Sequence, residues 1–174
     1  MQLNETRLVT LVGKGDERAY SELVERHLPV LEVYAKRIVS DDNLAQDIAQ
    51  DVMVVLWQRS GDFNPNKARL TTWLHRIAHN RCIDIMRKRQ REVSWDLSES
   101  EHPLTESDAP KEQQPIDLAL MRLPESQRTA LVLTYYQNLS NREVAEIMNS
   151  SVRAVESLLV RARGNLKKQL ETLQ

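Results

Sequence analysis

Apolar residues recur at every third or fourth position through most of the 174-residue chain. That spacing places them on one side of a helix, whereas the alternation expected of a half-buried strand is weak. Only four glycines and six prolines interrupt the pattern, which therefore predicts an all-α protein. In residues 3–39 it predicts two helices separated by Gly13 and Gly15, the second interrupted near Pro29 and resumed beyond it.

Residues 41–59 form the next predicted helix. Asp47 and Asp51, four positions apart, lie away from its apolar stripe, and Gln50 and Trp57 complete the outer surface. An amphipathic tryptophan beside carboxylates suits a protein partner that bears arginines; a solvated acidic surface is the alternative. The predicted buried stripe comprises Leu44, Ile48, Val52, Val55 and Leu56.

Residues 67–91 are strongly basic, with eight basic residues and one acidic residue, a net charge of +7. Trp73 lies at the start of this predicted helix, and Asn80 lies within it. Basic residues interleaved with an aromatic residue and an asparagine suit single-stranded nucleic acid, because bases stack and amide groups read base edges. A cationic helix with a core tryptophan is the alternative. The residues left for solvent or phosphates are Arg76, Asn80, Arg81, Arg87 and Lys88.

His75, His79 and Cys82 fall on one side of the same helix. A metal site would need a fourth ligand at suitable spacing, and the sequence offers none, so we expect no metal and no cofactor. A single cysteine cannot form an internal disulfide, which suits a reducing cytoplasm. No apolar run approaches membrane-spanning length, and the polar N-terminus lacks a signal-peptide core. We therefore expect a cytoplasmic protein without membrane insertion.

Residues 92–117 change character, with eight acidic residues, one basic residue and a net charge of −7. Pro103, Pro110 and Pro115 disfavour a long helix there. We interpret this segment as a flexible acidic linker, whose charge offsets the preceding +7 and explains the net charge of −1 for the whole chain. The predicted domains are residues 1–91 and 118–174.

The second domain contains a predicted helix-turn-helix in residues 139–163, preceded by helical sequence. Ser140 and Glu143 have the spacing of a capping box, and Leu139 and Val144 that of a hydrophobic staple. Asn149 suits a left-handed turn between the helices. Ser151 is placed to cap the second helix. The inward apolar stripe of that helix comprises Val155, Leu159, Ala162 and Leu166, and its outward side carries Arg153, Ser157 and Arg161.

An amphipathic second helix with outward arginines, held by a short first helix, has the geometry that enters a DNA major groove. A helical hairpin without DNA function is the alternative for these residues alone.

Three segments, in order, resemble the motifs of the extracytoplasmic-function (ECF) sigma factors: DDNLAQDIAQDVMVVLW, LTTWLHRIAHNRCIDIMRK and LPESQRTALVLTYYQNLSNREVAEIMNSSVRAVESLLVRAR. The resemblance spans roughly residues 15 to 168 around a variable linker. The sequence departs from the family pattern at Met53, Asn149, Glu156, Leu158 and Gly164.

The resemblance implies a non-enzymatic subunit with two small helical domains, sigma region 2-like and region 4-like. It implies binding to core RNA polymerase, at the coiled coil of the largest subunit and at the flap, and to promoter DNA at the nucleoid. An anti-sigma factor, in some cases at the membrane, is a further implied partner. The residues that match are Asp47, Gln50, Asp51 and Trp57 for polymerase; Thr72, Trp73, Arg76, Asn80 and Arg87 for the −10 element; and Arg153, Glu156, Ser157, Val160, Arg161 and Arg163 for the −35 element.

Two other functions compete with this interpretation. A stand-alone helix-turn-helix regulator explains residues 139–163 but leaves the +7 helix unexplained. A helical adaptor without DNA function explains neither basic surface.

Overall fold

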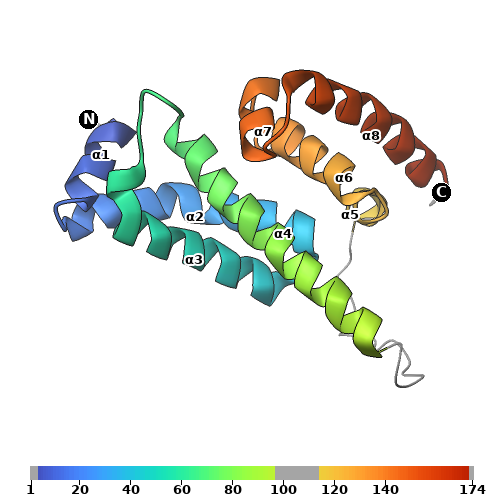
Figure 1. Ribbon diagram of the computed structural model, residues 1–174, viewed down its shortest axis with the longest axis horizontal. Helices are drawn as coiled ribbons and strands as arrows, with labels where there is room; N and C mark the ends of the chain where they lie inside the picture. The colour runs from blue at the N-terminus through green and yellow to red at the C-terminus, as the bar shows by residue number, and fades with distance from the viewer. Residues whose placement is uncertain (1–3, 97–113, 173–174) are drawn as a thin grey trace.

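The computed structural model describes residues 4–96 and 114–172, and within these ranges every regular element is helical. The all-α prediction is confirmed. Figure 1 shows the first four helices as one group and the last four as a second group beside it. The elements are α1 (Glu5–Val12), α2 (Glu17–Val39), α3 (Asp42–Arg59), η1 (Ser60–Asp62), α4 (Leu70–Asp96), α5 (Pro115–Met121), α6 (Glu125–Leu131), η2 (Val132–Tyr136), α7 (Asn141–Ile147) and α8 (Val152–Thr172).

The two N-terminal helices separate where the sequence predicts. Gly13 is the residue after α1, Gly15 has a φ of 83°, and the Asp16 carboxylate then caps α2 by accepting from two backbone amides. The predicted interruption near Pro29 is wrong, because α2 is continuous from Glu17 to Val39. Pro29 and Glu25 are both exposed, so water can satisfy the carbonyl group that loses its helical partner.

α3 packs along α2 mainly through the predicted stripe, with a shift toward its alanines. Ile48, Val52 and Leu56 are buried as expected, but Leu44 and Val55 are only half-buried and Met53 takes a place in the core. Ala45 and Ala49 are also buried on this side. Their small side chains allow the two helix backbones to lie close together, which turns α3 toward its alanines and away from Val55.

α4 and α5 shorten the predicted linker at both of its ends. α4 continues past the predicted domain boundary to Asp96, and its C-terminal part projects away from both groups of helices (Figure 1). α5 begins at Pro115, where proline suits the first turn because that position needs no amide donor. The rest of the predicted linker, residues 97–113, lies outside the described residues.

The helix-turn-helix follows the predicted design. The Ser140 hydroxyl accepts from the Glu143 amide while the Glu143 carboxylate accepts from the Ser140 amide, so the capping box is complete. Asn149 has a φ of 49°, and the Ser151 hydroxyl caps α8 at the Ala154 amide over 3.1 Å. The predicted inward stripe of α8 is buried at Val155, Leu159 and Ala162 and half-buried at Leu166. The π-helical segment η2, which precedes the motif, was not predicted.

The two groups of helices share one continuous core. Buried residues from α1–α4 and from α5–α8 belong to a single apolar cluster. α7 lies against α4, and α5, α6 and η2 lie against α2. The second domain is therefore packed on the first.

Candidate functional site

Three exposed faces carry most of the residues singled out from the sequence. The α3 face consists of Asp47, Gln50, Asp51, Val54 and Trp57, which are all exposed and follow one another at helical spacing. Neither Asp47 nor Asp51 has a hydrogen-bond or ion-pair partner among the described residues. This face therefore offers two unpaired carboxylates beside a tryptophan that is 38% exposed.

Trp57 lines a shallow surface groove at the end of the α3 face. Its ring meets the Tyr20 ring edge-on, with the centroids 5.0 Å apart, and Val54 lies beside it. Glu17 and Ser21 of α2 form the other wall. Val54 and Tyr20 were not among the predicted site residues, although Val54 has the helical spacing from Asp51 and Trp57 that could have identified it.

The α4 face consists of Trp73, Arg76, Asn80 and Arg87, which recur at helical spacing on one side of α4. Arg76, Asn80 and Arg87 are exposed, and none has a hydrogen-bond or ion-pair partner within the described ranges. Trp73 is half-buried and packs against Phe63 with the ring centroids 5.9 Å apart. Trp73 therefore contributes to the core as well as to this surface.

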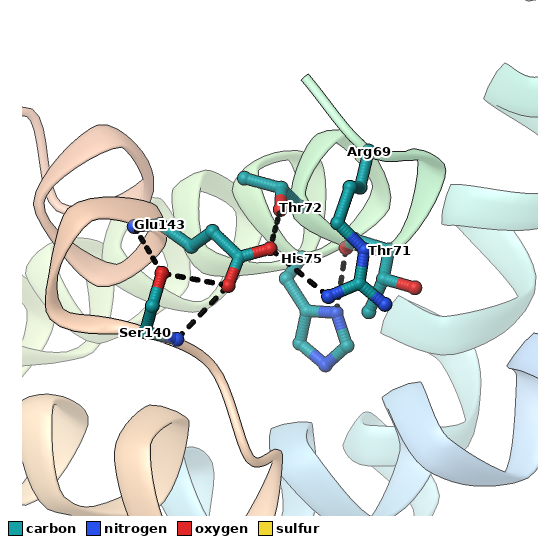
Figure 2. Close-up of polar contacts among 6 residues, drawn as sticks. All are labelled: Arg69, Thr71, Thr72, His75, Ser140 and Glu143. Carbon is teal, nitrogen blue, oxygen red and sulfur yellow. Dashed lines mark hydrogen bonds and ion pairs between the residues drawn. The ribbon is translucent and has the colours of Figure 1, made fainter. Parts of the chain in front are cut away.

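Thr72, predicted together with these residues, is covered by the second domain. Its side chain is 2% exposed, and its hydroxyl donates to Oε1 of Glu143 over 3.0 Å. Figure 2 shows the Glu143 side chain lying between Ser140 and Thr72. The structure thus separates Thr72 from the exposed residues of the α4 face.

Glu143 uses its two carboxylate oxygens for different partners. Oε2 accepts from the amide and the hydroxyl of Ser140, both at 2.9 Å, and so completes the helix cap. Oε1 accepts from Thr72 and, at 3.3 Å, from the Arg69 guanidinium. Burial acts to raise the pKa of this carboxyl, but the bonds from Ser140 and Thr72 and the Arg69 charge outweigh it, and the pKa is lowered. Glu143 is therefore ionised at neutral pH.

His75 forms a second polar contact between the domains. Its Nδ1 lies 2.8 Å from the Thr71 carbonyl oxygen, which can only accept, so Nδ1 carries a proton. Burial lowers the pKa of the ring despite the bonds to Thr71 and Gln137, so the ring is neutral and Nε2 offers a lone pair. Oε1 of Gln137 lies 3.2 Å from Nε2. Because Nε2 of the neutral ring accepts, the side-chain amide satisfies it in the flipped orientation, with its NH₂ group toward the ring.

His79 and Cys82, which the sequence placed on the same side of the helix as His75, also face the core. Nδ1 of His79 lies 3.1 Å from the Tyr34 hydroxyl, and Cys82 is fully buried, which raises its pKa to about 12. Within the described part of the chain, no group of three or more His, Cys, Asp or Glu side chains is arranged to hold a metal.

The α8 face consists of residues on the outer side of the second helix of the helix-turn-helix. All of them are exposed, and Val160, at 65%, is the most exposed large apolar residue in the described part of the chain. Nε of Arg161 lies 3.4 Å from the Ser157 carbonyl of the same helix, which leaves its terminal NH₂ groups free to reach outward. The α8 face comprises Arg153, Glu156, Ser157, Val160, Arg161 and Arg163.

Comparison with known proteins identifies the family. Residues 23–92 match the Sigma-70 region 2 family, and residues 113–166 match the Sigma-70, region 4 family. Over 159 residues the chain is 30% identical to the ECF RNA polymerase sigma factor RpoE of Cereibacter sphaeroides, covering 89% of this chain and 88% of that protein. The chain belongs to the ECF sigma factors. It therefore acts in transcription initiation, as the resemblance implied.

Solved structures of sigma factors have the same fold. CnrH in complex with the cytosolic domain of CnrY matches with a TM-score of 0.75 and 28% identity, covering 97% of each chain. The sigma factor RpoE in complex with the anti-sigma factor NepR from Bartonella quintana matches with a TM-score of 0.73 and 27% identity, covering 87% of this chain and 96% of that one. The match to region 2 explains the N-terminal domain, which a stand-alone helix-turn-helix regulator does not. No helix in the described ranges has the length and hydropathy needed to cross a bilayer.

Proposed function

We propose that the three faces divide the work of this sigma factor among polymerase, the −10 element and the −35 element. The observation that carries the proposal is their separation: each lies on a different helix, is exposed, and has a chemistry suited to one partner. The chain would carry out no chemical step itself, because RNA synthesis belongs to the polymerase.

The α3 face would bind the coiled coil of the largest polymerase subunit. Unpaired Asp47 and Asp51 would meet basic residues of the partner, and opposite charges at an interface guide association. The Trp57 groove would take an apolar side chain, since a partly exposed tryptophan is a favourable anchor at interfaces.

The α4 face would hold the non-template strand of the −10 element once the duplex opens. Arg76 and Arg87 would contact phosphates, Asn80 would read the edge of an unpaired base, and the exposed part of Trp73 would stack on a base. Thr72 would join this site only after the second domain leaves it.

The α8 face would read the −35 element in the major groove. Arg153, Arg161 and Arg163 supply phosphate or guanine contacts, Glu156 can accept from cytosine, and Val160 suits a thymine methyl group. Part of the second domain would also contact the polymerase flap.

An anti-sigma factor would be a further partner, since two similar sigma factors have been solved with CnrY and with NepR. The site of action would be the nucleoid, where core polymerase and promoter DNA meet.

Reconstitution with core RNA polymerase tests the function. Adding the chain to core polymerase on a library of bacterial promoter fragments should produce run-off transcripts of defined length from a subset of fragments. The double variant D47R/D51R should produce none while keeping the helicity of the wild type. Transcripts that do not depend on the chain, or equal activity of this variant, would contradict the proposal.

A further inference from the structure

One acidic residue, Asp84, interrupts the basic segment of α4. Residues 67–91 contain eight basic residues, and Asp84 is their single acid. Asp84 follows Asn80 by four positions and precedes Arg87 by three, so it belongs to the same side of α4 as these two residues of the α4 face. It is exposed, as they are. A carboxylate therefore lies within the surface to which we assign the −10 element.

The Asp84 carboxylate has no partner, although basic residues lie at helical spacing from it. Arg81, Arg87 and Lys88 are three or four positions away, the spacing at which side chains on a helix can meet. Lys88 instead lies 4.0 Å from Glu92, one turn farther on. Asp84 has no hydrogen-bond or ion-pair partner among the described residues. An ion pair within the helix therefore does not explain the carboxylate, and both of its oxygens are open to a ligand.

A carboxylate at this place has a cost when DNA binds. Arg76 and Arg87 attract phosphates, and a negative charge between them on the same side of the helix repels those phosphates. The cost is offset where the carboxylate meets a base, because a carboxylate accepts hydrogen bonds and the amino group of a base donates them. The phosphates would then lie toward the two arginines, with the edge of a base toward Asp84.

Cytosine is the base that suits a carboxylate best. On its major-groove edge it presents the N4 amino group with no acceptor beside it. Adenine presents its N6 amino group next to the acceptor N7, guanine presents the two acceptors N7 and O6, and thymine presents the acceptor O4. A carboxylate is therefore attracted to cytosine and repelled by the corresponding group of thymine.

We propose that Asp84 is a specificity-determining residue, which selects cytosine at one position of the −10 element by accepting a hydrogen bond from its N4 amino group. The proposal rests on the proposed function of the α4 face. A helix rises about 1.5 Å per residue, so Asp84 lies about 6 Å from Asn80 along the helix axis. Stacked bases are about 3.4 Å apart. The cytosine should therefore lie within about two nucleotides of the base that Asn80 reads.

The variant D84N tests this proposal, because it changes the chemistry of the side chain and keeps its size. An amide both accepts and donates, so it can turn toward N4 of cytosine or toward O4 of thymine and should no longer distinguish them. The matched control is E92Q. Glu92 is an exposed acid of the same helix, two turns farther on, and its substitution removes the same negative charge.

Base preference is measured with the complete holoenzyme, formed from core polymerase and the full chain. The template is a promoter selected in the run-off assay, with each of the four bases placed in turn at every position of the −10 element and of the adjoining base pairs. The rate of run-off transcription is compared between templates for the wild type, D84N, E92Q and N80A. The ratio between two templates cancels any general gain in affinity from the lost negative charge, so it reports base recognition alone.

The wild type and E92Q should prefer cytosine to thymine by about tenfold at one position. D84N should reduce this preference to about twofold or less and leave the preferences at other positions unchanged. N80A should change the preference at a position within about two nucleotides of the one that D84N affects.

Three results would overturn the proposal. The first is a gain for D84N on all templates with unchanged preferences, because Asp84 would then only temper the charge of the surface. The second is a loss of preference that E92Q reproduces, and the third is no difference between D84N and the wild type. In each of these cases the wild type still transcribes, so the proposed function stands. A wild-type chain that gives no transcript from any template contradicts the proposed function, and the role of Asp84 with it.

Discussion

The Tyr34 hydroxyl lies 3.1 Å from Nδ1 of His79 and joins the inner sides of α2 and α4. Tyr34 is fully buried, and burial raises the pKa of its hydroxyl well above the usual value, so the group stays protonated. It can therefore donate to a neutral imidazole. Protonation of His79 would place a cation in this core and remove the acceptor.

This contact predicts that stability falls in mildly acidic solution. Burial lowers the pKa of His79 from 6.5 to about 4, so between these values the unfolded chain binds a proton that the folded chain does not. The contribution of neutral His79 to the free energy of unfolding is therefore fully present above pH 6.5 and is lost as the pH falls toward 4. At about 1.4 kcal/mol per unit of pKa difference, the loss by pH 5 is at most about 2 kcal/mol.

Urea unfolding at pH 7.5 and pH 5 checks this prediction. In H79N the amide oxygen replaces Nδ1 as acceptor without titrating, so the variant should lose less stability than the wild type over this range. A smaller pH dependence should persist in H79N, because burial also lowers the pKa of His75. The same loss in H79N and wild type would show that His79 is not the group responsible.

The second prediction concerns the α3 face. Asp51 is exposed and unpaired within the described ranges, so D51R should leave helicity and thermal stability unchanged while weakening binding to core polymerase. A loss of about tenfold corresponds to 1.4 kcal/mol. The control is E171R, which makes the same charge reversal at an exposed position near the end of α8. Equal polymerase affinity for D51R, E171R and wild type, measured by surface plasmon resonance, would remove the α3 face from the interface.

The sequence identified the local structure well because the decisive signals are local. The Ser140–Glu143 capping box, the left-handed Asn149 and the Ser151 cap each depend on residues within a few positions of one another, and all three are present. The exposed sides of α3, α4 and α8 follow from helical periodicity in the same way. Pro29 misled the prediction because its cost depends on whether the freed carbonyl group faces water, which only the packing decides.

The contact between the domains could not be read from the sequence. Thr72 and Glu143 lie 71 positions apart, and neither residue carries a local sign of the other. The sequence assigned Thr72 to the −10 element and Glu143 to the helix cap. Both assignments are compatible with the hydrogen bond that joins the two side chains. The sequence thus predicted the two domains correctly as helical units but gave no signal of how they pack.

The third prediction tests strand opening on the α4 face. Asn80 is exposed and has no hydrogen-bond or ion-pair partner within the described ranges, so N80A should not alter the fold. Loss of a contact to an unpaired base costs about 1–3 kcal/mol, so open-complex formation should decrease while closed-complex binding stays the same. Permanganate reactivity of the −10 thymines reports opening. Wild-type reactivity in N80A would exclude this role. W73A is a poorer test, because Trp73 also packs on Phe63 and its removal would destabilise the domain.

The last prediction concerns Arg161 on the α8 face. Its Nε lies near the Ser157 carbonyl of its own helix, so its terminal NH₂ groups remain available to DNA. If these groups contact a phosphate, R161A should bind every −35 duplex more weakly, and the slope of log affinity against log salt should fall by about one. If they contact a guanine, the salt slope should change little, and discrimination at one base pair should fall by about 1–3 kcal/mol. The control is R122A, which removes an exposed arginine of the same domain outside the helix-turn-helix. Anisotropy titrations at several salt concentrations, against the selected −35 duplex and its single-base variants, separate the two results. If R161A matches R122A in affinity, salt slope and discrimination, the DNA-reading side of α8 has been assigned to the wrong residues.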